Sequence, residues 1–286
     1  MKRIVIKLIA PLLCLIGLWS CSDDESSMSY ADKQWTEKTV AVVLPMEKGL
    51  AAHWERTLGM FATNFERAFK KHETGIRLKF EYYDEANADM QELAQSLAFN
   101  DEVYAVIGGL YSSNAAILAA ELTLVGKTFF TLATTEQLVR AYASTGYLWA
   151  MTETDITQCE VLLSKVINYG GKSVALLAKD NDNYGQTFMD WFAFQARELG
   201  LKNMGSYAYT PDNIADVSRQ AMQSGAKYLI CIPSEIEEMG PMLEAHKTQS
   251  LNGQSVPRML FSDTAYGADV LKIHGDAAEG IEGVAF

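Results

Sequence analysis

The sequence predicts an α/β protein with two doubly wound parallel-sheet lobes and a cleft between them. From about residue 38 onward, short apolar runs alternate strictly with helical stretches, which is the pattern of a parallel sheet covered by helices. The alternation restarts near residue 151 after a first series of similar length, and this predicts two lobes rather than one long sheet. Half of the chain is apolar and 21% is charged, so we expect a globular protein.

The first lobe is predicted at residues 38–150. Its opening run KTVAVVLP is apolar throughout, as expected for a strand covered on both faces, whereas RLKFEYYD alternates as a second strand does. The predicted elements are strands at 38–45 and 77–84, helices at about 50–72 and 87–99, and a strand–helix–strand unit within 103–135.

The second lobe is predicted at residues 151–278. The run KYLICI indicates a buried strand, and the glycine pair at 170–171 is a good helix stop signal. The predicted helices are 154–169, 184–199, 214–224, 234–248 and 265–274, and the predicted strands are 172–179, 202–209, 227–232 and 258–262, with another beginning at 280.

Two loops of small, hydroxyl-bearing residues mark the end of neighbouring strands in the first lobe. They are residues 108–113 (GGLYSS) and residues 131–135 (TLATT). In a strand–helix–strand unit both loops emerge at the same sheet edge, where free backbone N–H groups suit an anion such as a carboxylate. The alternative is that both are ordinary strand-to-helix turns in which Ser112 or Ser113 caps a helix.

Composition and motifs argue against several classes of protein. The net charge of −12 argues against a nucleic-acid binder. No CxxC or Cys/His ligand spacing occurs, so we expect no metal site, and Cys159 and Cys231 are expected to be buried free thiols. No GxSxG elbow or phosphate loop occurs, and the four histidines have no evident nucleophile partner. We therefore expect neither an enzyme nor a bound cofactor.

The N-terminus has the pattern of an export signal. Three basic residues precede the apolar run at 8–19, which is too short to cross a bilayer comfortably. The sequence LWSC resembles a bacterial lipobox, which implies that residues 1–20 are a signal peptide and that Cys21 is lipidated. The alternative is a simple secretory signal or a signal anchor.

Residues 21–37 are predicted to be an acidic tether. The sequence SDDESS directly after Cys21 resembles the tether that directs lipoproteins of Bacteroidetes-type bacteria to the cell surface. A flexible, solvated linker explains it equally well, so the face of the outer membrane stays open.

Taken in order, seven motifs resemble those of the type 1 periplasmic binding proteins, in particular the leucine/isoleucine/valine-binding branch that serves ABC transporters. They are VAVVLP, YYDEANADMQELAQSL, VYAVIGGLYSSNAA, FFTLATTEQL, KDNDNYGQTF, KYLICIPSEIEEMGPMLEA and MLFSDTAYGAD. The resemblance implies the periplasmic binding protein-like I fold and binding of an amino acid. Members of the family continue further, so it also implies that residues 279–286 begin a return crossover and that the chain is truncated.

The resemblance also implies a set of ligand-binding residues. Ser112 and Thr135 would give hydroxyls, and Ala133 a backbone N–H, to the carboxylate of the ligand. The resemblance also implies that Trp54 is an aromatic residue that packs on the ligand and that Tyr184 is a tyrosine of the second lobe at the site. It implies that Asp263 is the acid that pairs with the ammonium group.

These last three residues also have purely structural interpretations. Trp54 can face the core of its helix, Tyr184 can begin a helix, and Asp263 can be a turn residue. A buried acid without a cation is costly, however, and a bound ammonium would supply one.

These observations lead to two hypotheses. The first is a lipid-anchored solute-binding protein that captures a small amphipathic ligand, an amino acid, and delivers it to an ABC permease. The second keeps the fold but makes the protein an interaction or sensor lipoprotein, for example an activator of a cell-wall synthesis enzyme.

Overall fold

The computed structural model describes residues 33–46, 50–180 and 182–284. The predicted signal peptide, Cys21 and most of the acidic tether lie outside the described residues. No helix in the described ranges is long and apolar enough to cross a membrane.

The chain divides into two compact units. The first contains residues up to Lys38 and Ala52–Lys79, and the second contains Thr39–Ala51 and Phe80–Phe286. The boundaries between the units fall inside strands β1 (Gln34–Leu44) and β2 (Thr74–Asp84) and inside helix α2 (Leu50–Arg67).

Aromatic side chains organise the first unit. Phe61, Phe65 and Phe69 follow one another along one side of the α2 helix and the turn after it, with ring centroids 6.1 and 5.4 Å apart. The Arg77 side chain forms an ion pair with Glu66 at 3.0 Å, and its guanidinium lies 4.9 Å from the centre of the Trp35 ring. The predicted helix at 50–72 ends earlier, at Arg67, and residues 68–72 form turns.

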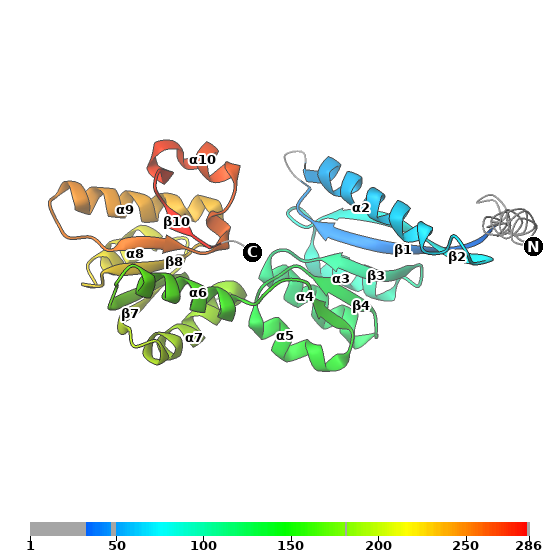
Figure 1. The fold of residues 1–286 in the computed structure, drawn as a ribbon, viewed down its shortest axis with the longest axis horizontal. Coiled ribbons are helices and arrows are strands. Elements are labelled where there is room, and N and C mark those ends of the chain that lie inside the picture. Colours follow the sequence, from blue (N-terminus) through cyan, green and yellow to red (C-terminus); the bar gives the residue numbers. More distant parts are fainter. Residues whose placement is uncertain (1–32, 47–49, 181, 285–286) are drawn as a thin grey trace, which may run out of the picture. The chain divides into compact units, whose positions relative to one another are not determined.

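The second unit contains most of two parallel sheets of five strands (Figure 1). The first sheet has the order β2-β1-β3-β4-β5, and the second has the order β10-β9-β8-β6-β7. The remaining strands are β3 (Val103–Gly108), β4 (Thr128–Thr131), β5 (Leu148–Ala150), β6 (Ser173–Lys179), β7 (Lys202–Tyr209), β8 (Tyr228–Ile232), β9 (Arg258–Phe261) and β10 (Glu282–Gly283). The predicted α/β fold with two parallel-sheet lobes is confirmed.

Helices connect the strands, as the alternation in the sequence predicts. They are α3 (Met90–Phe99), α4 (Ser112–Leu124), α5 (Glu136–Tyr142), α6 (Asp155–Asn168), α7 (Asn183–Glu198), α8 (Ile214–Met222), α9 (Met239–Leu251) and α10 (Ala268–His274). Four short 3-10 segments occur at 143–145, 236–238, 263–265 and 275–278.

Strand β6 shows why the second sheet is buried on both sides. Its side chains alternate, so that Ala175 and Leu177 join the core under α8, α9 and α10, while Leu176 and Ala178 join the core under α6 and α7. All four are fully buried. Cys159 on α6 and Cys231 on β8 are buried free thiols, as predicted.

One face of the first sheet packs in a buried cluster with three helices. Ala41, Val43 and Phe129 pack with α3, α4 and α5 (Figure 1). On the edge strand β5, the side chain of Trp149 is 56% exposed. Val40, Val42 and Leu44 alternate with Ala41 and Val43 along β1 and are also buried, so β1 is covered on both faces while the side chain on β5 is exposed.

Candidate functional site

The first predicted loop begins at a glycine that no other residue can replace. Gly108 ends β3 with φ = 135°, and a Cβ at this position would lie 1.9 Å from the carbonyl oxygen of Val43 on β1. Only glycine adopts this conformation and permits this approach. The chain then turns through Gly109 into α4, which begins at the buried Ser112.

A carboxylate of the chain itself occupies part of this loop. Glu85, at the end of β2, accepts hydrogen bonds from the backbone N–H groups of Leu110 and Tyr111, both at 2.9 Å. Burial raises the pKa of Glu85 to about 6, although the two N–H groups oppose this change. The loop therefore binds an anion, as its sequence suggests, but these two N–H groups are already used. Neither Ser112 nor Ser113 caps α4: its N-cap is Tyr111.

The second predicted loop is joined to the first by hydrogen bonds. The backbone N–H of Leu132 donates to the carbonyl of Gly108 at 3.0 Å, and the Thr131 hydroxyl lies 3.4 Å from the carbonyl oxygen of Gly109. The same hydroxyl accepts the N–H of Ala133 at 3.1 Å. The two loops thus lie side by side at the sheet edge, but the N–H predicted to bind a ligand has a partner within the chain.

Thr135 is 1% exposed. Its hydroxyl lies 3.1 Å from the carbonyl oxygen of Asn183 and 3.1 Å from the hydroxyl of Thr187, both on α7. A hydroxyl has one proton to donate, so Thr135 gives it to a ligand only by giving up the hydrogen bond to Asn183, while the Thr187 hydroxyl can still donate to Thr135. The neighbouring Thr134 is half-buried.

In the second sheet, the structure brings two predicted residues into contact. The Tyr184 hydroxyl, in the first turn of α7, lies 2.6 Å from a carboxylate oxygen of Asp263, which follows β9. Burial and the Asp263 charge raise the pKa of Tyr184. The carbonyl oxygen of the Gln158 side chain lies 2.9 Å from the same hydroxyl and 3.2 Å from the backbone N of Asp263.

Asp155, the first residue of α6, was not among the predicted site residues. It is fully buried, and its carboxylate accepts the backbone N–H of Glu136 at the start of α5, at 2.9 Å. Burial raises its pKa to about 7, while the Glu136 N–H and the Thr187 hydroxyl act in the opposite direction. Asp155 therefore links α6 to the loop that contains Thr135.

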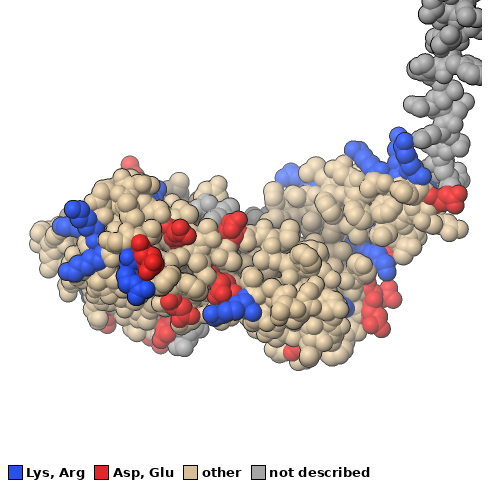
Figure 2. Space-filling view, turned by 60° about the horizontal axis from the view of Figure 1, so that its bottom comes forward, with Lys and Arg blue, Asp and Glu red and all other residues tan. Residues whose placement is uncertain are grey.

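Lys179, the last residue of β6, forms an ion pair with Glu238, which lies in the 3-10 segment after β8. Lys179 and Glu238 are 2.7 Å apart, and Glu238 also accepts hydrogen bonds from the Tyr209 hydroxyl and the Ser234 N–H, each at 2.8 Å. Burial alone would raise the pKa of Glu238, but Lys179, Tyr209 and Ser234 lower it overall. On the face shown in Figure 2, acidic and basic side chains are interspersed.

Trp54 belongs to the first compact unit, whereas the other five predicted ligand residues belong to the second. Its ring meets His53 edge-on at 5.2 Å, and its indole N–H is buried with no hydrogen-bond partner in the described ranges. Its role in ligand binding, like those of the other five residues, stays a prediction.

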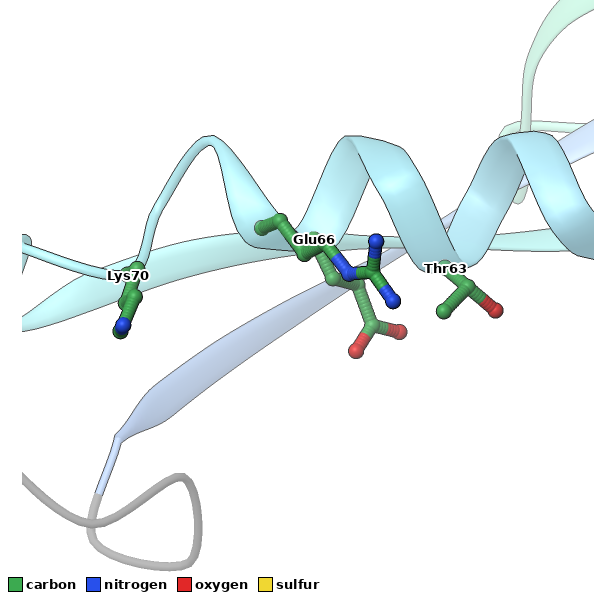
Figure 3. Close-up of a pocket in the computed structure, with 4 residues that line it drawn as sticks. Thr63, Glu66 and Lys70 are labelled. Atoms are coloured by element: carbon green, nitrogen blue, oxygen red, sulfur yellow. The ribbon is translucent and has the colours of Figure 1, made fainter.

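Two surface hollows occur elsewhere. One, of about 410 Å³, is lined by Thr63 and Glu66 on α2 and by Lys70 in the turn after the helix (Figure 3). The other, of about 400 Å³, lies beside α9 and includes His246 and His274. Neither includes a predicted ligand residue. No group of three potential metal ligands occurs within the described part of the chain.

Comparison with solved structures shows the fold. A Desulfitobacterium hafniense ABC transporter substrate-binding protein in complex with Leu is 20% identical, with a TM-score of 0.65 over 88% of this chain and 71% of the other. A Thermotoga maritima leucine-binding protein is 18% identical, with a TM-score of 0.66 over 85% and 68%. An R. palustris solute-binding protein in complex with 4-hydroxybenzoate is 20% identical, with a TM-score of 0.68 over 86% and 67%.

No curated protein matches the chain. A family model described as "Periplasmic binding protein" matches residues 39–286, which is most of the sequence. The matched region includes both sheets and the loops that carry Ser112, Thr135, Tyr184 and Asp263. The chain therefore belongs to the periplasmic binding protein family.

Proposed function

We propose that this protein is a lipid-anchored solute-binding protein that captures a small amphipathic ligand, an amino acid, for ABC-type uptake. The acid that follows β9 carries the proposal. Asp263 is half-buried and hydrogen-bonded to Tyr184, and within the described ranges no lysine or arginine forms an ion pair with it. A carboxylate held in this way suits an ammonium group.

The carboxylate of the ligand would bind at the joined loops of the first sheet. Ser112 begins α4, and the positive end of the helix dipole favours an anion there. Because the Thr135 hydroxyl has partners on α7, we propose that the half-buried Thr134 shares the role predicted for Thr135. Solved structures with the same fold include proteins in complex with Leu and with 4-hydroxybenzoate, so both ligand classes belong in the test.

Lipid anchoring and uptake are proposed from the sequence and the family. The LWSC sequence supports lipidation of Cys21, and SDDESS supports a tether between the lipid and the folded part. Membership of the periplasmic binding protein family supports a location outside the cytoplasm and transfer of the ligand to an ABC permease.

Isothermal titration calorimetry of the chain with a panel of amino acids and hydroxybenzoates tests the function. We expect saturable binding of at least one amino acid and a loss of at least tenfold in affinity in Asp263→Asn, because a hydrogen bond or ion pair to a charged group contributes roughly 1.5–3 kcal/mol. Glu244→Gln, on the outer helix α9, is the control and should bind normally. Absence of binding to every compound would contradict the proposal.

A second function is favoured because side chains of the protein itself already bind the polar groups of the loops at 108–113 and 131–135. Glu85 occupies two N–H groups, Thr131 occupies the N–H of Ala133, and Thr135 bonds to α7. A site filled by the protein's own side chains suits an interaction or sensor lipoprotein of the same fold. Co-purification with a cell-wall synthesis enzyme, together with no binding of small solutes, would support this alternative.

A further inference from the structure

One fully buried side chain contacts both second-sheet residues of the proposed site. Gln158 projects from α6, and its side-chain oxygen lies 2.9 Å from the Tyr184 hydroxyl and 3.2 Å from the backbone N of Asp263. Tyr184 in turn lies 2.6 Å from the Asp263 carboxylate. The Tyr184 hydroxyl has one proton, and its shorter contact is with the Asp263 carboxylate, so the hydrogen bond that Gln158 makes in its own right is the one it accepts from the Asp263 N–H. Three groups from α6, α7 and the segment after β9 therefore form a triangle, all within the second lobe.

The triangle requires a neutral acceptor at position 158. The backbone N–H of Asp263 is a donor, and an apolar side chain would leave it without this partner. A glutamate would supply the acceptor but would add a negative charge next to Asp263. Glutamine provides an acceptor oxygen without that charge.

The other half of the Gln158 amide shows that this residue is not optimal for stability alone. Its nitrogen is buried with no hydrogen-bond partner in the described ranges. A buried unpaired amide nitrogen destabilises a fold. An apolar residue would avoid that cost, so the contacts of the oxygen are the reason to have glutamine here.

We infer that Gln158 is a positioning residue of the ligand site, which holds Tyr184 and the Asp263 backbone so that the Asp263 carboxylate is directed at the ammonium group of the ligand. The inference rests on the proposed function. Gln158 does not need to touch the ligand. It acts through Asp263, and it should affect ligands with an ammonium group more than ligands without one.

The test compares two ligands that differ only in the amine. L-leucine and 4-methylpentanoate share the same carbon skeleton and carboxylate, and calorimetry gives the affinity of wild type and Gln158→Met for each. We expect Gln158→Met to weaken leucine binding about three- to tenfold, the effect of a lost neutral hydrogen bond, and to change 4-methylpentanoate binding by no more than about twofold. If another amino acid binds more tightly, that amino acid and its deaminated acid replace the pair.

Gln195 offers a matched control. It is a buried glutamine on α7 whose amide nitrogen donates to the carbonyl of Ile156 on α6 at 3.0 Å and whose oxygen has no partner in the described ranges. Gln195→Met therefore removes one buried side-chain hydrogen bond between the same two helices, away from Tyr184 and Asp263. The melting temperature of each variant is measured alongside, and Gln195→Met should leave the ratio of the two affinities unchanged.

Gln158→Asn keeps a neutral amide but shortens the side chain by one methylene, and it provides a second test if the methionine variant does not fold. We expect it to weaken the preference for leucine over 4-methylpentanoate, because its oxygen no longer reaches the Asp263 N–H. If wild type binds leucine and both position-158 variants keep the wild-type ratio, the inference is overturned and the proposed function stands. If wild type binds no compound of the panel, the proposed function fails and the inference fails with it.

Discussion

The two sheets differ in how their faces are covered. The second sheet has a buried cluster on each face, and neighbouring residues of β6 contribute to opposite clusters. In the first sheet, one face packs in a cluster with helices, and Val40, Val42 and Leu44 of β1 are buried on the opposite face. Tyr104 on β3 and Trp149 on β5 are nevertheless 63% and 56% exposed. A parallel sheet is ordinarily covered on both faces. The second sheet is therefore the better supported frame for the residues that it positions, which include Gln158, Tyr184 and Asp263.

The largest difference in stability is expected between variants of two aromatic residues on neighbouring strands of the first sheet, one buried and one exposed. Phe129→Ala should lower the free energy of unfolding by about 3–5 kcal/mol, because Phe129 is fully buried. Trp149→Thr on the next strand should lower it by no more than about 1–2 kcal/mol, because more than half of Trp149 is already exposed. Urea denaturation measures both. Equal losses would show that the exposed face is packed in solution.

Two neighbouring leucines test whether both faces of the second sheet are equally supported. Leu176→Ala and Leu177→Ala remove fully buried side chains from opposite faces of β6. Each should lower the free energy of unfolding by about 2–5 kcal/mol. A loss in only one of the two variants, measured by the same denaturation, would contradict the two-faced core.

Asp155 should make stability depend on pH. Its pKa is raised from 3.8 to about 7 by burial, so the folded state binds its proton more tightly than the unfolded state does. The resulting stabilisation is present below about pH 4 and is lost as the pH rises toward 7. At about 1.4 kcal/mol for each pKa unit, the loss is roughly 2–4 kcal/mol.

Asp155→Asn should remove this contribution and keep an acceptor for the Glu136 N–H. Denaturation at several pH values should then show the variant gaining stability relative to wild type between pH 4 and 7. A difference between the two proteins that does not change with pH would contradict the raised pKa.

The smallest predicted change in stability concerns two adjacent threonines, Thr134 and Thr135. Thr135→Val removes the hydroxyl that bonds to α7 and should cost about 1 kcal/mol of stability. Thr134→Val should cost little, because Thr134 is half-buried, and should weaken ligand binding more than Thr135→Val does. The reverse order of ligand affinities would support the role first predicted for Thr135.

Much of the fold can be predicted from local sequence patterns. Strand β7 has the predicted bounds, and α6 and α7 lie within one residue of their predicted ends. Apolar runs and glycine stops are local signals, so they need no knowledge of the partner strand. Helix α5, which was not predicted, has seven residues and only one of them is buried, so its periodic signal is weak.

Less of the candidate site could be predicted, because its contacts join residues that are far apart in the sequence. The sequence shows that the loop at 108–113 suits an anion, but it does not show that Glu85, 25 residues before Leu110, supplies one. Gln158 and Asp263 are 105 residues apart. Neither contact has a local signal: Glu85 ends an alternating strand, and Gln158 is one polar residue on a helix.

We propose that Asp263 binds the ammonium group of an amino acid. A calorimetric comparison of two proteins and two ligands tests this proposal. Wild type and Asp263→Asn are each titrated with L-leucine and with 4-methylpentanoate. We expect wild type to prefer leucine by at least tenfold and the variant to lose this preference while it still binds 4-methylpentanoate. An unchanged preference in Asp263→Asn would show that Asp263 does not bind the ammonium group.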